Sequence, residues 1–157
     1  MKKKDFLISI IVPTKDRPQY LCRSIQSIID QTYTNWECLI IDDNSKIPVV
    51  ESIDHLIKGD ERFFLIRNSY SHFASQSRNL GITKAKGKFI AFLDDDDYWD
   101  KDKLKLQINF MAENNYTNSV QRLGIPDRIV EHGSQDELYR ECYYDDEAII
   151  QFCNKML

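Results

Sequence analysis

Hydrophobic positions in the first 113 residues form short continuous runs that alternate with helical stripes. The opening run, residues 6–12, is rich in β-branched side chains, which is typical of a strand covered on both faces. The apolar positions that follow it are spaced as one face of a helix, which Asp16 would cap. Repetition of this pattern predicts strands at 6–12, 36–41, 63–67 and 88–93, and helices at about 17–29, 48–58, 73–85 and 100–113.

This alternation of strand and helix is the signature of right-handed βαβ units. We therefore expect an α/β fold: a Rossmann-like, mainly parallel sheet with helices on both faces. Such sheets bind ligands beyond the carboxyl ends of their strands. The polar segments that follow the expected strands are 13–17 (PTKDR), 42–45 (DDNS), the residues from Asn68 onward, and 94–97 (DDDD). They would meet at one edge of the sheet, which becomes the candidate active site.

The pattern changes near residue 115, so we expect two parts: a domain at 1–115 and an extension at 116–157 that packs on it. A capping box at Ser134 and Glu137 predicts one helix in the extension, and an irregular strand precedes it. The final helix is predicted from an apolar stripe made of Ile149, Cys153, Met156 and Leu157.

Composition fits a globular protein, with 42% hydrophobic and 29% charged residues among 157. The net charge of −4 gives no positive field, so nucleic acid is not an expected partner. The four cysteines lack zinc-site spacing, which favours a reduced, cytoplasmic protein. No run approaches the ~20 apolar residues of a membrane span, although the lysines at 2–4 could contact an anionic membrane surface weakly.

The most unusual feature is the run of four aspartates at 94–97, directly after an expected buried strand. Adjacent carboxylates are costly unless a positive charge lies among them. Hard oxygen ligands favour Mg²⁺ or Mn²⁺, which commonly complete their shell with substrate phosphates. Asp94 and Asp96 lie on the same side of an extended segment, as two metal ligands would. The alternative is a solvated acidic turn that caps the next helix.

Two further residues are candidates for ligand binding. Asp43 ends another strand, where it could accept a hydrogen bond from a nucleotide base or ribose, or simply cap a helix. Arg78 lies on the apolar stripe of its helix, facing the sheet. A guanidinium there needs an anion, which is either a neighbouring aspartate or the diphosphate of a ligand.

These motifs resemble, in order and spacing, the nucleotide-sugar-binding half of family-2 glycosyltransferases, which have the GT-A fold. The resemblance covers residues 6–113, and its segments are 13–17, 31–33 (QTY), 42–45, 77–81 (SRNLG) and 87–97 (GKFIAFLDDDD). It implies transfer of a sugar from a nucleoside diphosphate sugar, foremost a UDP-sugar, to a hydroxyl of a saccharide or lipid-linked acceptor. Lys15 and Asp16 stand where the family often has an aromatic residue and asparagine.

The resemblance also implies roles for individual residues. Asp43 would contact the base, Arg78 the base or diphosphate, and Asp95 the ribose. Asp96, assisted by Asp94 in a DXD motif, would bind Mn²⁺ or Mg²⁺, which would neutralise the departing diphosphate. The residues implied to bind the nucleotide sugar are Pro13, Thr14, Asp16, Arg17, Asp43, Arg78, Asp94 and Asp95.

A base that deprotonates the acceptor is also required, and the resemblance assigns it to no residue of this sequence. In the family the base lies beyond the aspartate run, in a segment on the acceptor side. The alternative functions are a non-catalytic nucleotide-binding fragment or chimera without an acceptor half, and nucleotidyl transfer.

Part of the C-terminal extension has a different resemblance. Residues 119–147 are similar to the end of the C-terminal domain of deoxyxylulose-phosphate synthase, a thiamine enzyme. No cofactor motif accompanies this similarity, so it does not imply thiamine chemistry. His132 lies in this segment and is expected to be a packed or capping residue rather than a general base.

Overall fold

The computed structural model describes residues 5–71 and 73–113, which contain all eight elements expected before the change of pattern. The segment from 114 onward, including the predicted extension, its helices and His132, lies outside the described residues. The elements in chain order are β1 (Ile8–Thr14), α1 (Pro18–Ile29), β2 (Trp36–Asp42), α2 (Val50–Ile57), β3 (Phe63–Arg67), α3 (Phe73–Lys84), β4 (Phe89–Phe92) and α4 (Lys103–Glu113).

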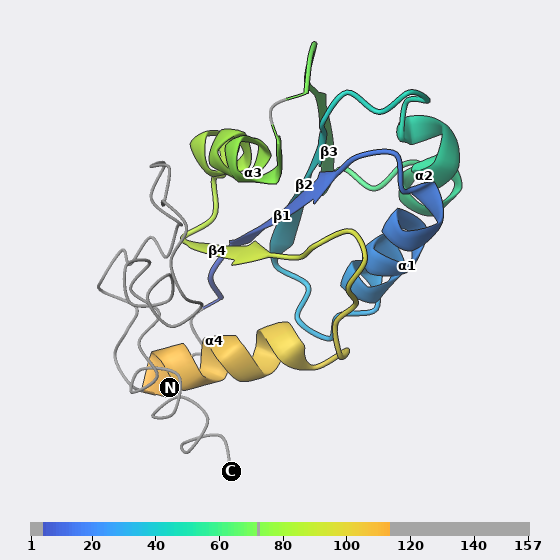
Figure 1. Ribbon diagram of the computed structural model, residues 1–157. Coiled ribbons are helices and arrows are strands. Elements are labelled where there is room, and N and C mark those ends of the chain that lie inside the picture. The colour runs from blue at the N-terminus through green and yellow to red at the C-terminus, as the bar shows by residue number, and fades with distance from the viewer. Residues whose placement is uncertain (1–4, 72, 114–157) are drawn as a thin grey trace, which may run out of the picture. The chain divides into compact units, whose positions relative to one another are not determined.

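The four strands form one sheet in the order β3-β2-β1-β4, and every pairing is parallel. The chain builds outward from β1 to β3 and then returns to place β4 on the other side of β1 (Figure 1). Thr14 pairs with Asp42, and Asp42 pairs with Arg67, so these strands end level with one another. The reversal of strand order beside β1 is where open α/β sheets bind their ligands.

Helices cover both faces of the sheet because successive side chains of a strand point to opposite sides. Ile10 and Val12 of β1 pack in a cluster with residues of α1, α2 and α4, whereas Ile11 packs in a second cluster with Leu80 and Ile82 of α3. Figure 1 shows α1 and α2 on one side of the sheet and α3 on the other. The expected α/β fold is confirmed for this part of the chain.

Helix α3 packs against the sheet at a glycine, where there is no room for a larger side chain. A Cβ on Gly81 would lie 2.5 Å from Cγ2 of Ile11, a distance that real side chains do not tolerate. Arg78 is three residues earlier and therefore lies about one helical turn away, on the side of the strands' carboxyl ends. The close packing of α3 thus carries Arg78 to the candidate site.

Candidate functional site

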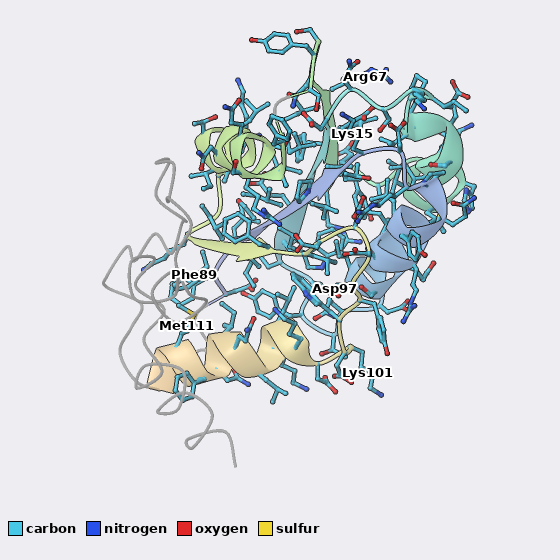
Figure 2. All side chains as sticks on the ribbon, in the orientation of Figure 1. Lys15, Arg67, Phe89, Asp97, Lys101 and Met111 are labelled. Carbon is cyan, nitrogen blue, oxygen red and sulfur yellow. The ribbon has the colours of Figure 1, made fainter. Side chains whose placement is uncertain are left out.

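The segments that follow the strands meet at the carboxyl edge of the sheet, as expected. The amide of Asp43 donates to the Thr14 carbonyl at 2.9 Å, and the amide of Asn68 donates to the Asp42 carbonyl at 2.9 Å. The Thr14 hydroxyl donates to Oδ2 of Asp95 at 2.8 Å, which joins the end of β1 to the residues after β4. Lys15 and Arg67, which follow β1 and end β3, are labelled at this edge in Figure 2.

The positive charge that the aspartate run requires is supplied by two arginines. Arg17 places Nη1 at 2.9 Å from Oδ2 of Asp96 and 3.3 Å from Oδ1 of Asp95. Arg78 forms an ion pair with Asp94. The sequence left open whether Arg78 pairs with a neighbouring aspartate or with a ligand diphosphate, and in this structure it pairs with Asp94.

Both ion pairs remain accessible to a ligand. The exposed fractions of the side chains are 53% for Arg17 and 51% for Asp96, and 25% for Arg78 and 48% for Asp94. Asp95 differs because only 8% of its side chain is exposed, and it accepts from both Thr14 and Arg17. Asp95 is therefore the anchored member of the run, and its neighbours on either side face solvent.

Asp43 is buried and holds the loop between β3 and α3. Its carboxylate accepts hydrogen bonds from Nδ2 of Asn68 at 2.9 Å, from Oγ of Ser71 at 2.6 Å and from the amide of Phe73 at 3.1 Å. Because Phe73 begins α3, Asp43 acts as a helix cap supplied by another segment, one of the two roles the sequence allowed. Contact with a nucleotide base stays a prediction.

The prediction that Asp16 caps α1 was wrong. Asp16 has a positive φ of 54°, and the helix begins after Arg17 with no side-chain cap. Oδ1 of Asp16 instead accepts from the amide of Lys46 at 2.7 Å, and its own amide donates to Oγ of Ser45 at 3.0 Å. Asp16 therefore joins the loop after β1 to the loop after β2. Pro13, also expected at the site, is buried within β1.

Three buried side chains near the site had no role assigned to them from the sequence, although Gln31 lies in one of the segments that resemble the family. Ser24, Ser27 and Gln31 lie on α1 or just after it and form hydrogen bonds with the chain that follows β4. Their signal is helical spacing of polar residues, which also describes the exposed face of an amphipathic helix. A buried face and a solvent face could not be distinguished from that spacing alone.

Lys103, the first residue of α4, has an unusual environment. Burial lowers the pKa of its ammonium group from 10.5 to about 8. Its Nζ lies 3.9 Å from the centre of the Trp99 ring and donates to Oε1 of Gln107 at 3.1 Å. Lys103 therefore faces a ring and an amide rather than bulk water.

The described residues can be tested for their fit to a divalent ion. They contain no group of three or more His, Cys, Asp or Glu side chains that could hold a metal. Mg²⁺ and Mn²⁺ need only one or two protein carboxylates where substrate phosphates complete the shell. Asp94 and Asp96 are accessible, hard oxygen donors and fit this smaller requirement if Arg17 and Arg78 release them. In the same part of the chain, no helix has the length and apolar character needed to cross a membrane.

Comparison with known proteins identifies the family. Residues 9–153 match the family model described as glycosyl transferase family 2. The chain belongs to glycosyl transferase family 2. It is 42% identical over 115 residues to the UDP-Glc:alpha-D-GlcNAc-diphosphoundecaprenol beta-1,3-glucosyltransferase WfgD of Escherichia coli, a match that covers 71% of this chain and 43% of WfgD. The chain thus spans less than half the length of this glycosyltransferase.

Two solved structures of nucleotide-sugar complexes share the fold. TarS 1-349 of S. aureus in complex with UDP-GlcNAc is similar with a TM-score of 0.65 and 24% identity, over 69% of this chain and 32% of that chain. The mannosyltransferase PcManGT from Pyrobaculum calidifontis, in complex with GDP-Man and Mn²⁺, gives 0.64 and 18%, over 69% of this chain and 33% of that chain. These similarities confirm the GT-A-like fold of this family-2 chain.

Proposed function

We propose that this chain binds the donor of a metal-dependent glycosyltransferase, which moves a sugar from a UDP-sugar to a hydroxyl of a saccharide or lipid-linked acceptor. The observation that carries the proposal is the meeting of accessible Asp94 and Asp96 with Arg17 and Arg78 at the carboxyl edge of the sheet. Carboxylates beside guanidinium groups can hold both parts of a metal diphosphate. Membership of glycosyl transferase family 2 supports this assignment.

Binding of the donor would exchange the partners of these side chains. Asp96, with Asp94, would hold Mn²⁺ or Mg²⁺, and the freed guanidinium groups of Arg17 and Arg78 would bind diphosphate oxygens. A divalent ion bound there supplies Lewis-acid stabilisation of the charge on the departing diphosphate. Asp95 remains fixed by Thr14 and would contact the ribose, while Asp43 would contact the base.

The printed names of similar proteins indicate the substrates. WfgD is named for UDP-Glc as donor and for a diphosphoundecaprenol acceptor, and TarS was solved with UDP-GlcNAc. These names support a role for this chain in polysaccharide biosynthesis. We further propose a cytoplasmic location, in which the lysines at 2–4 contact an anionic membrane surface weakly. None of the described residues is assigned as the acceptor base.

Calorimetric titration with UDP tests the proposal. UDP should bind about tenfold or more tightly with Mn²⁺ than with EDTA, and Asp96→Asn should remove that difference. Asp97→Asn is the matched control because it removes an equal charge from the next, exposed residue. Equal affinity in Mn²⁺ and EDTA for the unaltered chain would contradict the metal role. Turnover of a labelled UDP-sugar distinguishes a transferase from a nucleotide-binding fragment.

A further inference from the structure

Helix α1 and the second residue after it, Gln31, present a row of buried polar side chains. Ser24 and Ser27 are three residues apart and share one face of α1, and Gln31 follows four residues later in line with them. Their exposed fractions are 0%, 8% and 4%. Burial of polar side chains is unfavourable unless they are hydrogen-bonded, so the hydrogen-bond partners of these three side chains indicate what they stabilise.

The side chain of Ser24 contacts the main chain of residues 94–97, the acidic segment. Oγ of Ser24 lies 2.6 Å from the carbonyl oxygen of Asp97, 2.8 Å from that of Asp95 and 3.4 Å from that of Asp94. A hydroxyl has a single proton to donate, so these oxygens share one donor. Without that donor, the carbonyl groups of Asp95 and Asp97 would lose a shared hydrogen bond that offsets the repulsion between their dipoles.

Ser27 and Gln31 continue the same arrangement along the chain. The amide of Trp99 donates to Oγ of Ser27 at 3.1 Å. Nε2 of Gln31 donates to the Asp100 carbonyl at 2.7 Å, and the amide of Leu104 donates to Oε1 of Gln31 at 3.1 Å. The stretch between β4 and α4, on which Figure 2 labels Asp97 and Lys101, is therefore fastened to α1 at successive points.

This fastening determines where the carboxylates lie. The carbonyl oxygens of Asp94, Asp95 and Asp97 lie against Ser24 of α1. The side chains of Asp95 and Asp96 instead reach Arg17 at the edge of the sheet. Within the segment, the Asp97 amide donates to the Asp94 carbonyl at 3.1 Å and so forms a turn. The carbonyl oxygens of both Asp94 and Asp97 lie within hydrogen-bond distance of the Ser24 hydroxyl. The backbone is thus held on the α1 side, while the carboxylates of Asp94 and Asp96 remain accessible to solvent.

We propose that Ser24 is the positioning residue for the acidic segment, acting through main-chain carbonyls so that Asp94 and Asp96 can hold a metal together. This inference rests on the proposed function, because it concerns the same carboxylates. Removal of groups that orient metal ligands typically lowers metal affinity by about 10- to 100-fold. The contacts of Ser24 with the acidic segment are to main-chain oxygens rather than carboxylate oxygens, so its effect on the metal is indirect.

The test compares Ser24→Ala with Ser27→Ala in the full chain. Each variant removes one buried hydroxyl from the same helix, so the melting temperatures should fall by similar amounts. Of the two serines, Ser24 is the one that contacts the acidic segment. UDP affinity in Mn²⁺ should fall about tenfold or more for Ser24→Ala and less than about threefold for Ser27→Ala, with no difference in EDTA. Ser24→Cys, which keeps a weak donor, should fall between Ser24→Ala and the unaltered chain. Equal losses for the two alanine variants would overturn the proposal.

Hydrogen exchange in the ligand-free protein provides a second, independent readout. Ser24→Ala should raise exchange of the amides at 94–98 about tenfold, whereas Ser27→Ala should act mainly at Trp99. Unchanged exchange at 94–98 in Ser24→Ala would overturn the positioning role whether or not nucleotide binds. Absence of UDP binding by the unaltered chain would instead contradict the proposed function, and the exchange result would still decide the role of Ser24.

Discussion

Arg78→Met separates a ligand-binding arginine from a structural one. Methionine keeps a flexible apolar stem against the sheet and removes only the guanidinium group. The group that loses its partner is Asp94, whose side chain is 48% exposed. A carboxylate that is half in water can be hydrated, so it does not become a buried, unpaired charge.

The structure sets the size of the expected effect. An exposed ion pair contributes about 1 kcal/mol or less, whereas breaking a fully buried pair costs about 3–5 kcal/mol. The pair between Arg78 and Asp94 is closer to the first case, so the melting temperature should fall by about 2–4 °C or less. Loss of charge-assisted hydrogen bonds of about 1.5–3 kcal/mol to a diphosphate would weaken UDP binding by roughly 10- to 100-fold.

Thermal unfolding and calorimetric titration with UDP and Mn²⁺ measure these two quantities. Lys84→Met is the matched control because it removes a positive charge from the exposed far end of the same helix. A double-mutant cycle with Asp94→Asn should give a coupling energy below about 1 kcal/mol. A melting temperature lowered by more than about 8 °C, with UDP affinity unchanged, would refute the reasoning and make Arg78 a structural residue.

Two further predictions concern stability. Gly87→Ala should destabilise the protein by about 1–3 kcal/mol in thermal unfolding, because the new Cβ would lie 2.5 Å from the backbone nitrogen of Ser9. Lys86→Ala, at the exposed neighbouring residue, should change the stability little, and equal effects of the two variants would contradict this packing. Lys103 has a pKa lowered from 10.5 to about 8, so between these values the unfolded chain binds a proton that the folded chain lacks, and the free energy of unfolding should rise with pH there. Denaturant titrations across this range should show less of that rise in Lys103→Met, and identical pH profiles would disprove the assignment.

The eight elements were predictable because each has a strong local pattern. Buried parallel strands are continuous apolar runs, and the helices between them have apolar stripes. The ends were less predictable, and α4 illustrates the reason. Its helix was expected from residue 100 but begins at Lys103. Gln31, two residues beyond the end of α1, binds the Asp100 carbonyl before the helix and the Leu104 amide in its first turn, a contact that the local pattern does not specify.

The site was predictable in position and only partly in detail. Parallel topology alone brings Thr14 beside the aspartates after β4. The choice of Asp94 as the partner of Arg78 depends on side-chain geometry between two elements, which no spacing within the sequence specifies. Asp16 was misjudged as a cap because its positive φ is a property of the folded loop, although aspartate is among the residues that tolerate it.

The contact between Thr14 and Asp95 joins residues 81 positions apart, and this has a consequence for the order of folding. The entropy cost of closing a loop of that length must be met before the contacts between β4 and β1 can stabilise the chain. The neighbouring strands β1, β2 and β3 can pair through much shorter loops. We therefore expect a folding intermediate to contain the Asp43 side of the edge before the aspartate run joins it. The proposed metal ligands Asp94 and Asp96 would then come together only after β1, β2 and β3 have paired.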